Sequence, residues 1–128
     1  MLFGKTYKIS SFRIIELSMS NMHSITEYEI SCDGDTSVIK AFRRNYTDED
    51  RELIDIVSCG TDEVIEILNK CRLPKWDGFH GKHPRGVKDG TMFRFIAEVN
   101  GGKTIKADGS QNFPKDFHVF YKWLRDLI

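Results

Sequence analysis

The densest set of residues able to do chemistry lies between positions 74 and 90. His80 and His83 could act as general bases near neutral pH, and Asp77 or Asp89 could orient one of them. Basic side chains in the same stretch could hold an anionic substrate, and its glycines would let the backbone approach a ligand. On this hypothesis the chain is a small hydrolase- or transferase-like enzyme acting on an anionic substrate.

The same stretch can also be interpreted without a reaction. Its glycines would then serve turns, its charges would face water, and its two aromatic residues would pin the loop to the core. No nucleophile and no second fixed partner can be placed by spacing, so we assign no catalytic residue and favour a protein that is not an enzyme. The candidate ligand-binding residues are Trp76, Asp77, Phe79, His80, His83, Arg85 and Asp89.

Two histidines three positions apart, His80 and His83, also suggest a metal ion. Such a pair needs a third and a fourth ligand on an ordered backbone. His23, His118 and the cysteines have no recognisable spacing that would complete the set. We therefore predict no metal and no other cofactor.

Basic residues of this half of the chain together with two aromatic residues raise the hypothesis of single-stranded nucleic-acid binding with Trp76 and Phe79 as stacking platforms. Acidic residues interrupt the basic run, among them Asp77, Asp89 and Asp108, and no known nucleic-acid-binding motif appears. The whole chain is balanced, with 19 basic and 19 acidic residues. The chain as a whole therefore has no excess of positive charge that would attract nucleic acid or an anionic membrane. A protein partner or a small ligand is the expectation.

Size and composition are those of one globular domain spanning residues 1–128, with 40% hydrophobic residues. The N-terminus resembles no signal peptide, and no apolar run approaches the length of a membrane span. The three cysteines are odd in number and widely spaced, which favours free thiols in a reducing compartment. These features predict a cytoplasmic protein.

In the first half, apolar residues recur at strand spacing over 6–19, 25–32 and 38–46, with a bend at Ser10–Ser11. Asp33-Gly34-Asp35 favours a hairpin turn. Residues 47–58 remain open, because Thr47 and Asp50 could cap a helix while the following β-branched residues favour a strand.

The second half begins with a helix that Thr61 is expected to cap and Pro74 to end. A hairpin over 92–99 and 103–107 follows, and then a helix beginning at Pro114. The predicted order is ββββ-α-ββ-α. This describes an α+β fold, a mainly antiparallel sheet of about six strands with two helices packed on it.

Several short motifs resemble those of a group of small uncharacterised bacterial α+β domains. The residues are Tyr28-Glu29-Ile30-Ser31, Trp76-Asp77-Gly78-Phe79, Asp89-Gly90, Gly102-Lys103, Gly109-Ser110 and Phe113-Pro114, and the similarity covers about two-thirds of the chain. That group carries a tryptophan-rich strand where this chain has Phe93, and Gln111-Asn112 follow the Gly-Ser step here. The resemblance implies a bacterial α+β domain and no particular activity.

The leading hypothesis is a non-catalytic interaction or accessory domain, of which an immunity-like or antitoxin-like protein would be one instance. One surface of the sheet, or the 74–90 loop, would contact a protein or a small ligand. An enclosed pocket around the histidines would favour the enzyme instead.

Overall fold

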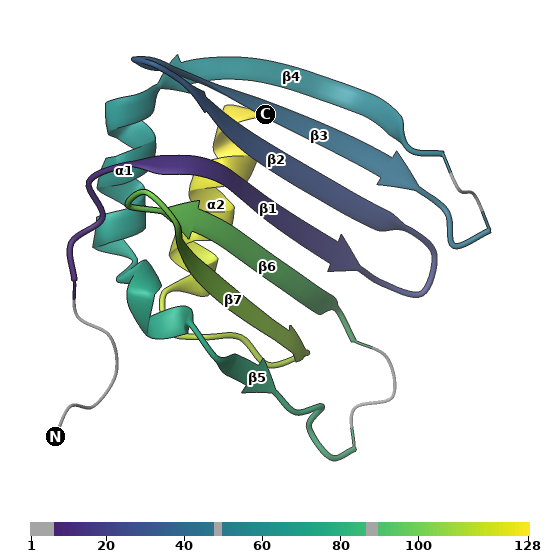
Figure 1. Cartoon of the computed structure of the whole chain (residues 1–128). Coiled ribbons are helices and arrows are strands. Elements are labelled where there is room, and N and C mark those ends of the chain that lie inside the picture. Colours follow the sequence, from purple (N-terminus) through teal and green to yellow (C-terminus); the bar gives the residue numbers. More distant parts are fainter. Residues whose placement is uncertain (1–6, 48–49, 87–89) are drawn as a thin grey trace, which may run out of the picture.

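One mixed sheet of seven strands forms the frame of the protein in the computed structural model, which describes residues 7–47, 50–86 and 90–128. The strand order is β4-β3-β2-β1-β6-β7-β5 (Figure 1). The strands are β1 (Phe12–Ser20), β2 (Ile25–Asp33), β3 (Thr36–Arg44), β4 (Glu52–Gly60), β5 (Phe79–Gly81), β6 (Met92–Val99) and β7 (Lys103–Ser110). No helix in these ranges is long and apolar enough to cross a membrane.

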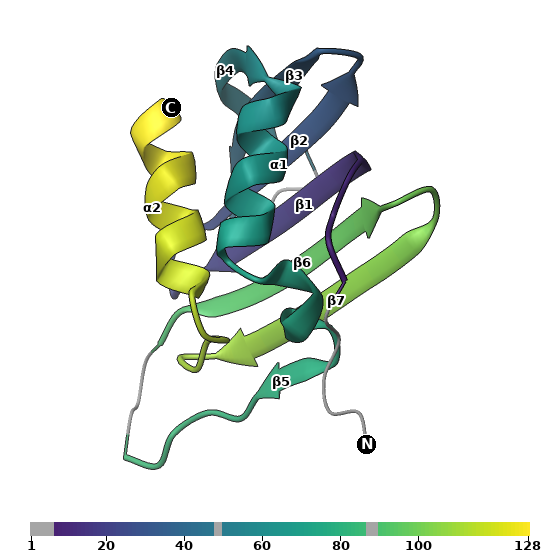
Figure 2. The same cartoon turned by 90° about the vertical axis from the view of Figure 1, so that its left-hand side faces the viewer.

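Two helices, α1 (Thr61–Lys70) and α2 (Phe117–Leu127), lie on the same face of the sheet (Figure 2). We call the opposite face, which carries no helix of the described chain, the open face. A short 3-10 helix, η1 (Leu73–Trp76), connects α1 to β5. The predicted α+β class is confirmed, and the order of the long elements agrees with ββββ-α-ββ-α.

The predicted number of strands was wrong by one, because β5 has only three residues. A segment this short has no measurable alternation, and it pairs with β7 in parallel, whereas the other pairs are antiparallel. The open question about residues 47–58 is decided for a strand, since β4 pairs with β3 along most of its length. Asp48 and Glu49, which could have formed part of a helix cap, lie outside the described residues.

The starts of two elements differ from the prediction. The first strand begins at Phe12, although its register shift between Phe12 and Ile14 lies close to the predicted bend. The last helix begins at Phe117, because Asp116 before it has a left-handed backbone with φ 68°. Pro114 lies instead in the preceding turn, where it is buried.

Thr61 has another role than the predicted helix cap, since it is the first residue of α1 and makes no capping bond. Its hydroxyl donates to the Gly34 carbonyl oxygen at 2.7 Å and contacts the Ser37 hydroxyl at 2.8 Å. Its backbone N–H donates to the Asp35 carbonyl oxygen at 2.8 Å. Thr61 therefore fastens α1 to the β2–β3 hairpin.

The core centres on Trp76, which is 1% exposed. Its ring lies 5.1 Å from that of Phe95 on the sheet and 5.6 and 5.9 Å from those of Phe117 and Phe120 on α2. Its indole N–H donates to the Lys115 carbonyl oxygen at 2.9 Å. One side chain thus joins η1, the sheet and the start of α2, with its polar atom satisfied.

All three cysteines are free thiols. Cys71 is buried, whereas Cys32 and Cys59 are half-buried. Burial raises the pKa of Cys71 to about 11, and the nearby Asp116 carboxylate acts in the same direction. Because its thiol stays protonated at neutral pH, Cys71 serves as a core residue rather than a nucleophile.

The residues just before the short strand β5 hold it on β7. The Asp77 carboxylate accepts a hydrogen bond from the Lys106 backbone N–H at 2.9 Å. Gly78, whose φ of 85° suits glycine, donates its N–H to the Lys106 carbonyl oxygen at 2.8 Å. The Phe79 ring packs 6.3 Å from the Phe93 ring. Three of the four residues Trp76-Asp77-Gly78-Phe79 therefore attach β5 to the sheet.

The loop after β7 passes closely beneath β5 and β7, on the helix side of the sheet. A Cβ atom on Gly109 would lie 2.2 Å from the Asn112 carbonyl oxygen, and one on Gly81 would lie 2.3 Å from the same atom. Both distances are far below van der Waals contact. Glycine is therefore required at both positions for this loop to reach α2.

We expect Leu124→Ala to lower the free energy of unfolding by about 2–5 kcal/mol, because Leu124 on α2 is 0% exposed and its removal leaves a cavity. The matched control is Val119→Ala on the same helix, which should change stability by no more than about 0.5 kcal/mol because Val119 is 41% exposed. Urea unfolding measures both. Equal effects of the two changes would contradict the packing of α2 on the sheet.

We expect Gly109→Ala to destabilise the protein by about 1–3 kcal/mol or more, because the added methyl group meets backbone that cannot easily move. Gly60→Ala is the control, since its Cβ would find its nearest neighbour at 4.0 Å and its backbone is extended. Thermal unfolding followed by circular dichroism compares them. A Gly109→Ala protein as stable as the control would show that the loop does not approach β7 this closely.

Candidate ligand-binding groove

Strand pairing arranges the open face in rows that run across the sheet. We call one of them the ionic row; it consists of His80 on β5, Asp108 on β7, Arg94 on β6, Ser18 on β1 and Glu27 on β2. Each is the register partner of the next. Since side chains two positions apart share a face of a strand, the neighbouring row lies about 7 Å away along the strands.

We call that neighbouring row the mixed row, because it combines hydroxyl, apolar and cationic side chains. Its members are Ser110 on β7, Met92 on β6, Ser20 on β1, Ile25 on β2 and Arg44 on β3. The members of the two rows other than Glu27, together with residues 80–83, line a groove of about 570 Å³ on the open face. That volume falls in the range of small-molecule sites.

The histidines predicted as site residues both reach this groove. His80 places Nδ1 against a carboxylate oxygen of Asp108, and His83 Nδ1 lies 2.7 Å from the Ser110 hydroxyl. The His80 side chain is 79% exposed and that of Asp108 is 52% exposed. Water therefore screens this pair strongly, and its contribution to stability is small.

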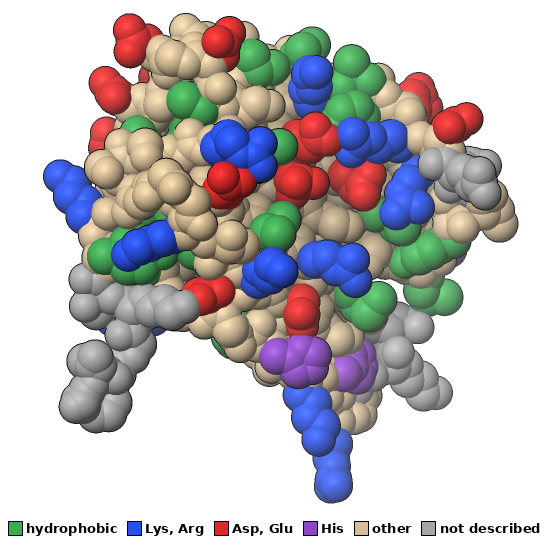
Figure 3. All heavy atoms as spheres, in the orientation of Figure 1, with side chains coloured by type: hydrophobic (Ala, Val, Ile, Leu, Met, Phe, Trp, Pro, Cys, Tyr) green, Lys and Arg blue, Asp and Glu red, His purple; other side chains and the backbone are tan. Residues whose placement is uncertain are grey.

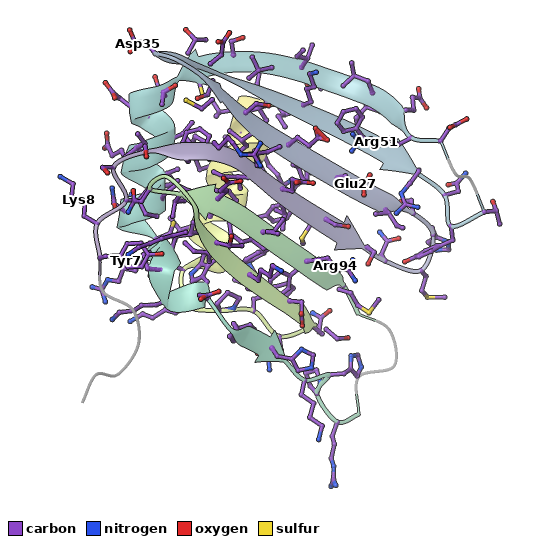
Figure 4. The ribbon with its side chains drawn as sticks, in the orientation of Figure 1. Tyr7, Lys8, Glu27, Asp35, Arg51 and Arg94 are labelled. Atoms are coloured by element: carbon purple, nitrogen blue, oxygen red, sulfur yellow. The ribbon has the colours of Figure 1, made fainter. Side chains whose placement is uncertain are left out.

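Arg94 stands in the middle of the ionic row and presents its guanidinium on the open face. It is exposed and forms no ion pair with any residue that the structure describes. Other arginines nearby are engaged, since Arg13 donates to Glu98 at 2.7 Å and Arg51 to Glu29 at 2.7 Å. Figure 4 shows Arg94 on β6 apart from the labelled Glu27 and Arg51.

The surface of the open face agrees with this arrangement. Figure 3 shows histidine side chains near the lower edge with an acidic side chain directly above them and basic side chains beyond it. Hydrophobic side chains lie beside this group. The groove is thus bordered by charge on one side and by apolar surface on the other.

The other predicted site residues lie elsewhere. Trp76 is in the core, Asp77 holds the backbone of β7, and Phe79 is half-buried against Phe93. Arg85 is exposed and does not line the groove. Asp89 lies outside the described residues. The structure therefore brings only the two histidines together.

Sequence reasoning missed Arg94, Ser18 and Ser110 as groove residues and named Asp108 only as an interruption of the basic run. A signal for Arg94 was present, because alternation in 92–99 places it opposite the buried Phe93 and Phe95. No signal placed Ser18 here, because only strand pairing brings β1 next to β6, and Ser110 lay beyond the strand predicted for 103–107.

The geometry of the site bears on two alternative hypotheses, nucleic-acid binding and metal binding. Trp76 is buried and cannot serve as a stacking platform for a base. In the part of the chain that the structure describes, no group of three or more His, Cys, Asp and Glu residues could hold a metal ion. The groove instead offers cations, imidazoles and hydroxyl groups, which are donors for an anion.

No protein-family model matches the chain, and neither a curated protein nor a solved structure shows significant similarity to it.

Proposed function

We propose that this protein is a non-catalytic binding domain whose groove takes an anionic group of a small ligand or of a partner protein. The observation that carries the proposal is Arg94, an exposed guanidinium without an ion pair among the described residues, at the floor of a groove. A guanidinium presents several N–H donors in a planar fork that fits carboxylate and phosphate groups.

The charges of the groove support this proposal, although the whole chain is neutral. Among the residues that the structure describes, three cationic side chains, Arg44, Lys82 and Arg94, line the groove with one carboxylate, Asp108, which His80 contacts. Arg44 is only loosely paired, with Nε 3.7 Å from a Glu27 carboxylate oxygen. A local positive surplus therefore faces any incoming ligand, and it would steer anions toward the groove.

The hydroxyl groups add uncharged donors. Ser18 is the register partner of Arg94 on β1, and Ser20 and Ser110 stand in the mixed row beside it. Ser20 has only a long contact of 3.5 Å to the Met92 carbonyl oxygen. These groups could complete the hydrogen bonds of an anion that Arg94 holds.

The exposure of the site supports binding rather than catalysis. His80, the residue best placed as a base beside a carboxylate, is 79% exposed. Acid–base and electrostatic catalysis gain most in sites that exclude water. A groove this open to solvent can hold an anion without excluding water from it.

We expect Arg94→Gln to weaken the binding of a simple anion about tenfold or more, because a charge-assisted hydrogen bond is lost. The measurement is a titration of the ¹⁵N-labelled protein with sodium phosphate and with sodium acetate at constant ionic strength, followed by backbone amide shifts. Arg13→Gln is the matched control, since Arg13 is already paired with Glu98. Anion-induced shifts in 80–83 and 92–94 are the expected footprint.

Two results would contradict the proposal. In one, neither anion shifts the amides around Arg94 at millimolar concentration. In the other, both anions shift them equally in the wild type and in Arg94→Gln.

A second candidate function, a small hydrolase on an anionic substrate, is favoured by one contact. The 2.7 Å separation of His83 Nδ1 and the Ser110 hydroxyl would let the imidazole accept the hydroxyl proton as the oxygen attacks an ester substrate. The bond to the ester alcohol would break, the alcohol would leave with that proton, and water would then release the acid from Ser110. Arg94 or Lys82 would then hold the charge of the substrate.

If the hydrolase hypothesis holds, we expect Ser110→Ala to reduce hydrolysis of p-nitrophenyl acetate or p-nitrophenyl phosphate by at least about a hundredfold. Ser58→Ala is the control, because Ser58 is exposed on β4 and does not line the groove. Release of p-nitrophenol measures the rate. Activity no higher in the wild type than in Ser110→Ala would leave binding as the function.

The cytoplasm remains the proposed location. Its support is that Cys32, Cys59 and Cys71 are all free thiols. A bacterial origin likewise remains a proposal, supported by the motifs around Trp76 and Gly109.

A further inference from the structure

Apolar side chains gather at one end of the groove. Met22 is 64% exposed, Tyr46 54% and Met92 50%, and all three line one hollow beside the groove. They come from the β1–β2 turn, from the chain after β3 and from the start of β6. We call these three residues the apolar shelf. Exposed large apolar residues that cluster in this way mark sites of interaction.

Hydrogen bonds hold two parts of the apolar shelf, Tyr46 and the turn that carries Met22, in place. The Tyr46 hydroxyl donates to the Asn21 carbonyl oxygen at 2.6 Å, which fixes the ring against the β1–β2 turn. The Asn21 side chain in turn accepts hydrogen bonds from the backbone N–H groups of His23 and Ser24 at 2.8 and 3.0 Å. The turn that carries Met22 is therefore held in a defined shape while its apolar side chain faces water.

The shelf and the groove are continuous. The hollow over the shelf shares Ser20, His83, Met92 and Ser110 with the groove. Met92 stands two positions before Arg94 on β6, on the same face of the sheet, so the two side chains lie about 7 Å apart along the strand. An anionic group held by Arg94 would therefore place its next few atoms over Met92.

The surroundings of Arg94 favour a ligand that is anionic at one end and apolar in the rest. A fully polar anion would leave three large apolar side chains in water, and an uncharged apolar ligand would leave the Arg94 guanidinium without a counter-charge. Methionine side chains are flexible and polarizable, which suits them to apolar ligands of varied shape. The aromatic ring of Tyr46 adds a rigid wall.

We propose, on the basis of the function proposed above, that the ligand is an organic acid with an apolar body, whose anionic group meets Arg94 and whose body lies on the apolar shelf. A carboxylate on a short aliphatic chain has this chemistry. The C-terminal carboxylate of a peptide that ends in an apolar residue has the same chemistry, and the experiment separates the two sources.

The test is a comparison of acetate, butyrate, hexanoate and hexylammonium in amide-shift titrations of the wild-type protein. Each methylene that reaches the shelf should tighten binding by up to about fourfold, so hexanoate should bind at least tenfold more tightly than acetate. Hexylammonium has the same apolar chain with the opposite charge and should bind far more weakly. Acetyl-glycyl-leucine and its C-terminal amide form the peptide arm.

Met92→Gln should remove most of the advantage of hexanoate over acetate, measured as the ratio of the two dissociation constants in the same variant. The matched control is Val119→Gln, an exposed apolar residue on α2 that lines neither hollow. Amide spectra of both variants confirm that they fold. Met22→Gln provides a second test of the shelf at a position in a turn rather than a strand.

Each outcome has a separate meaning. If hexanoate and acetate bind equally and both depend on Arg94, the further inference is wrong and the proposed anion-binding function stands. If hexylammonium binds as tightly as hexanoate, both proposals are wrong. If hexanoate is favoured and Met92→Gln abolishes the preference, the inference is confirmed. Tighter binding of the peptide acid than of hexanoate, with loss in the peptide amide, identifies a peptide terminus as the source.

Discussion

The groove depends on the pairing of a three-residue parallel strand with β7. Without β5, the chain that carries His80 and His83 would have no fixed position beside Asp108 and Ser110. So short a strand has few backbone hydrogen bonds of its own. Its position is secured instead by contacts just before it, where Asp77 and Gly78 bond both backbone groups of Lys106. The Trp76 ring in the core anchors the chain one residue further back.

The pairing of β5 with β7 also explains the sequence from Gly109 to Phe113, at the end of β7 and just after it. Gly109 permits the close approach of the Asn112 carbonyl oxygen, and Ser110 turns its hydroxyl to the other face, toward His83. The Gln111 side chain accepts a hydrogen bond from the Thr91 backbone N–H at 2.7 Å, and the Gln111 backbone N–H donates to the Thr91 carbonyl oxygen at 2.8 Å. Phe113 then stacks on Phe117 at 4.9 Å. Most residues of the motif thus serve architecture, and one side chain reaches the groove.

Exposed apolar residues form two groups on the open face and at its border, and the two groups differ in how they are protected from contact with another chain. On the edge strand β4, Leu53, Ile54 and Ile56 are exposed, but Asp55 accepts a hydrogen bond from the Ile56 backbone N–H at 2.8 Å and the register shifts opposite Ala41 and Phe42. A charged side chain and a bulge are features that keep an edge strand from pairing with another chain. The apolar shelf has neither of these features among the described residues and borders a cationic groove. The shelf, rather than the edge strand, is therefore the better candidate for binding a ligand or a partner.

Local patterns were sufficient for most of the elements. Alternation in β2 and β6 predicted which side chains are buried, because a strand with one face on a core must place every second residue inward. Helical spacing likewise puts Phe117, Phe120 and Leu124 of α2 on one face, and all three are buried. The strand β5 could not be predicted, because three residues carry no period and its partner β7 lies far along the chain.

Only part of the candidate site could be predicted from the sequence. His80 and His83 could be named from residue type alone, because their chemistry does not depend on their neighbours. Arg94, Ser18 and Ser110 are ordinary strand residues, and their meaning comes from the strand order that places β1, β6 and β7 side by side. The sequence by itself determined the faces of the strands and helices, since these follow from local periodicity. Only the tertiary structure decided which polar residues meet, since pairing between distant strands depends on long-range contacts that no local pattern encodes.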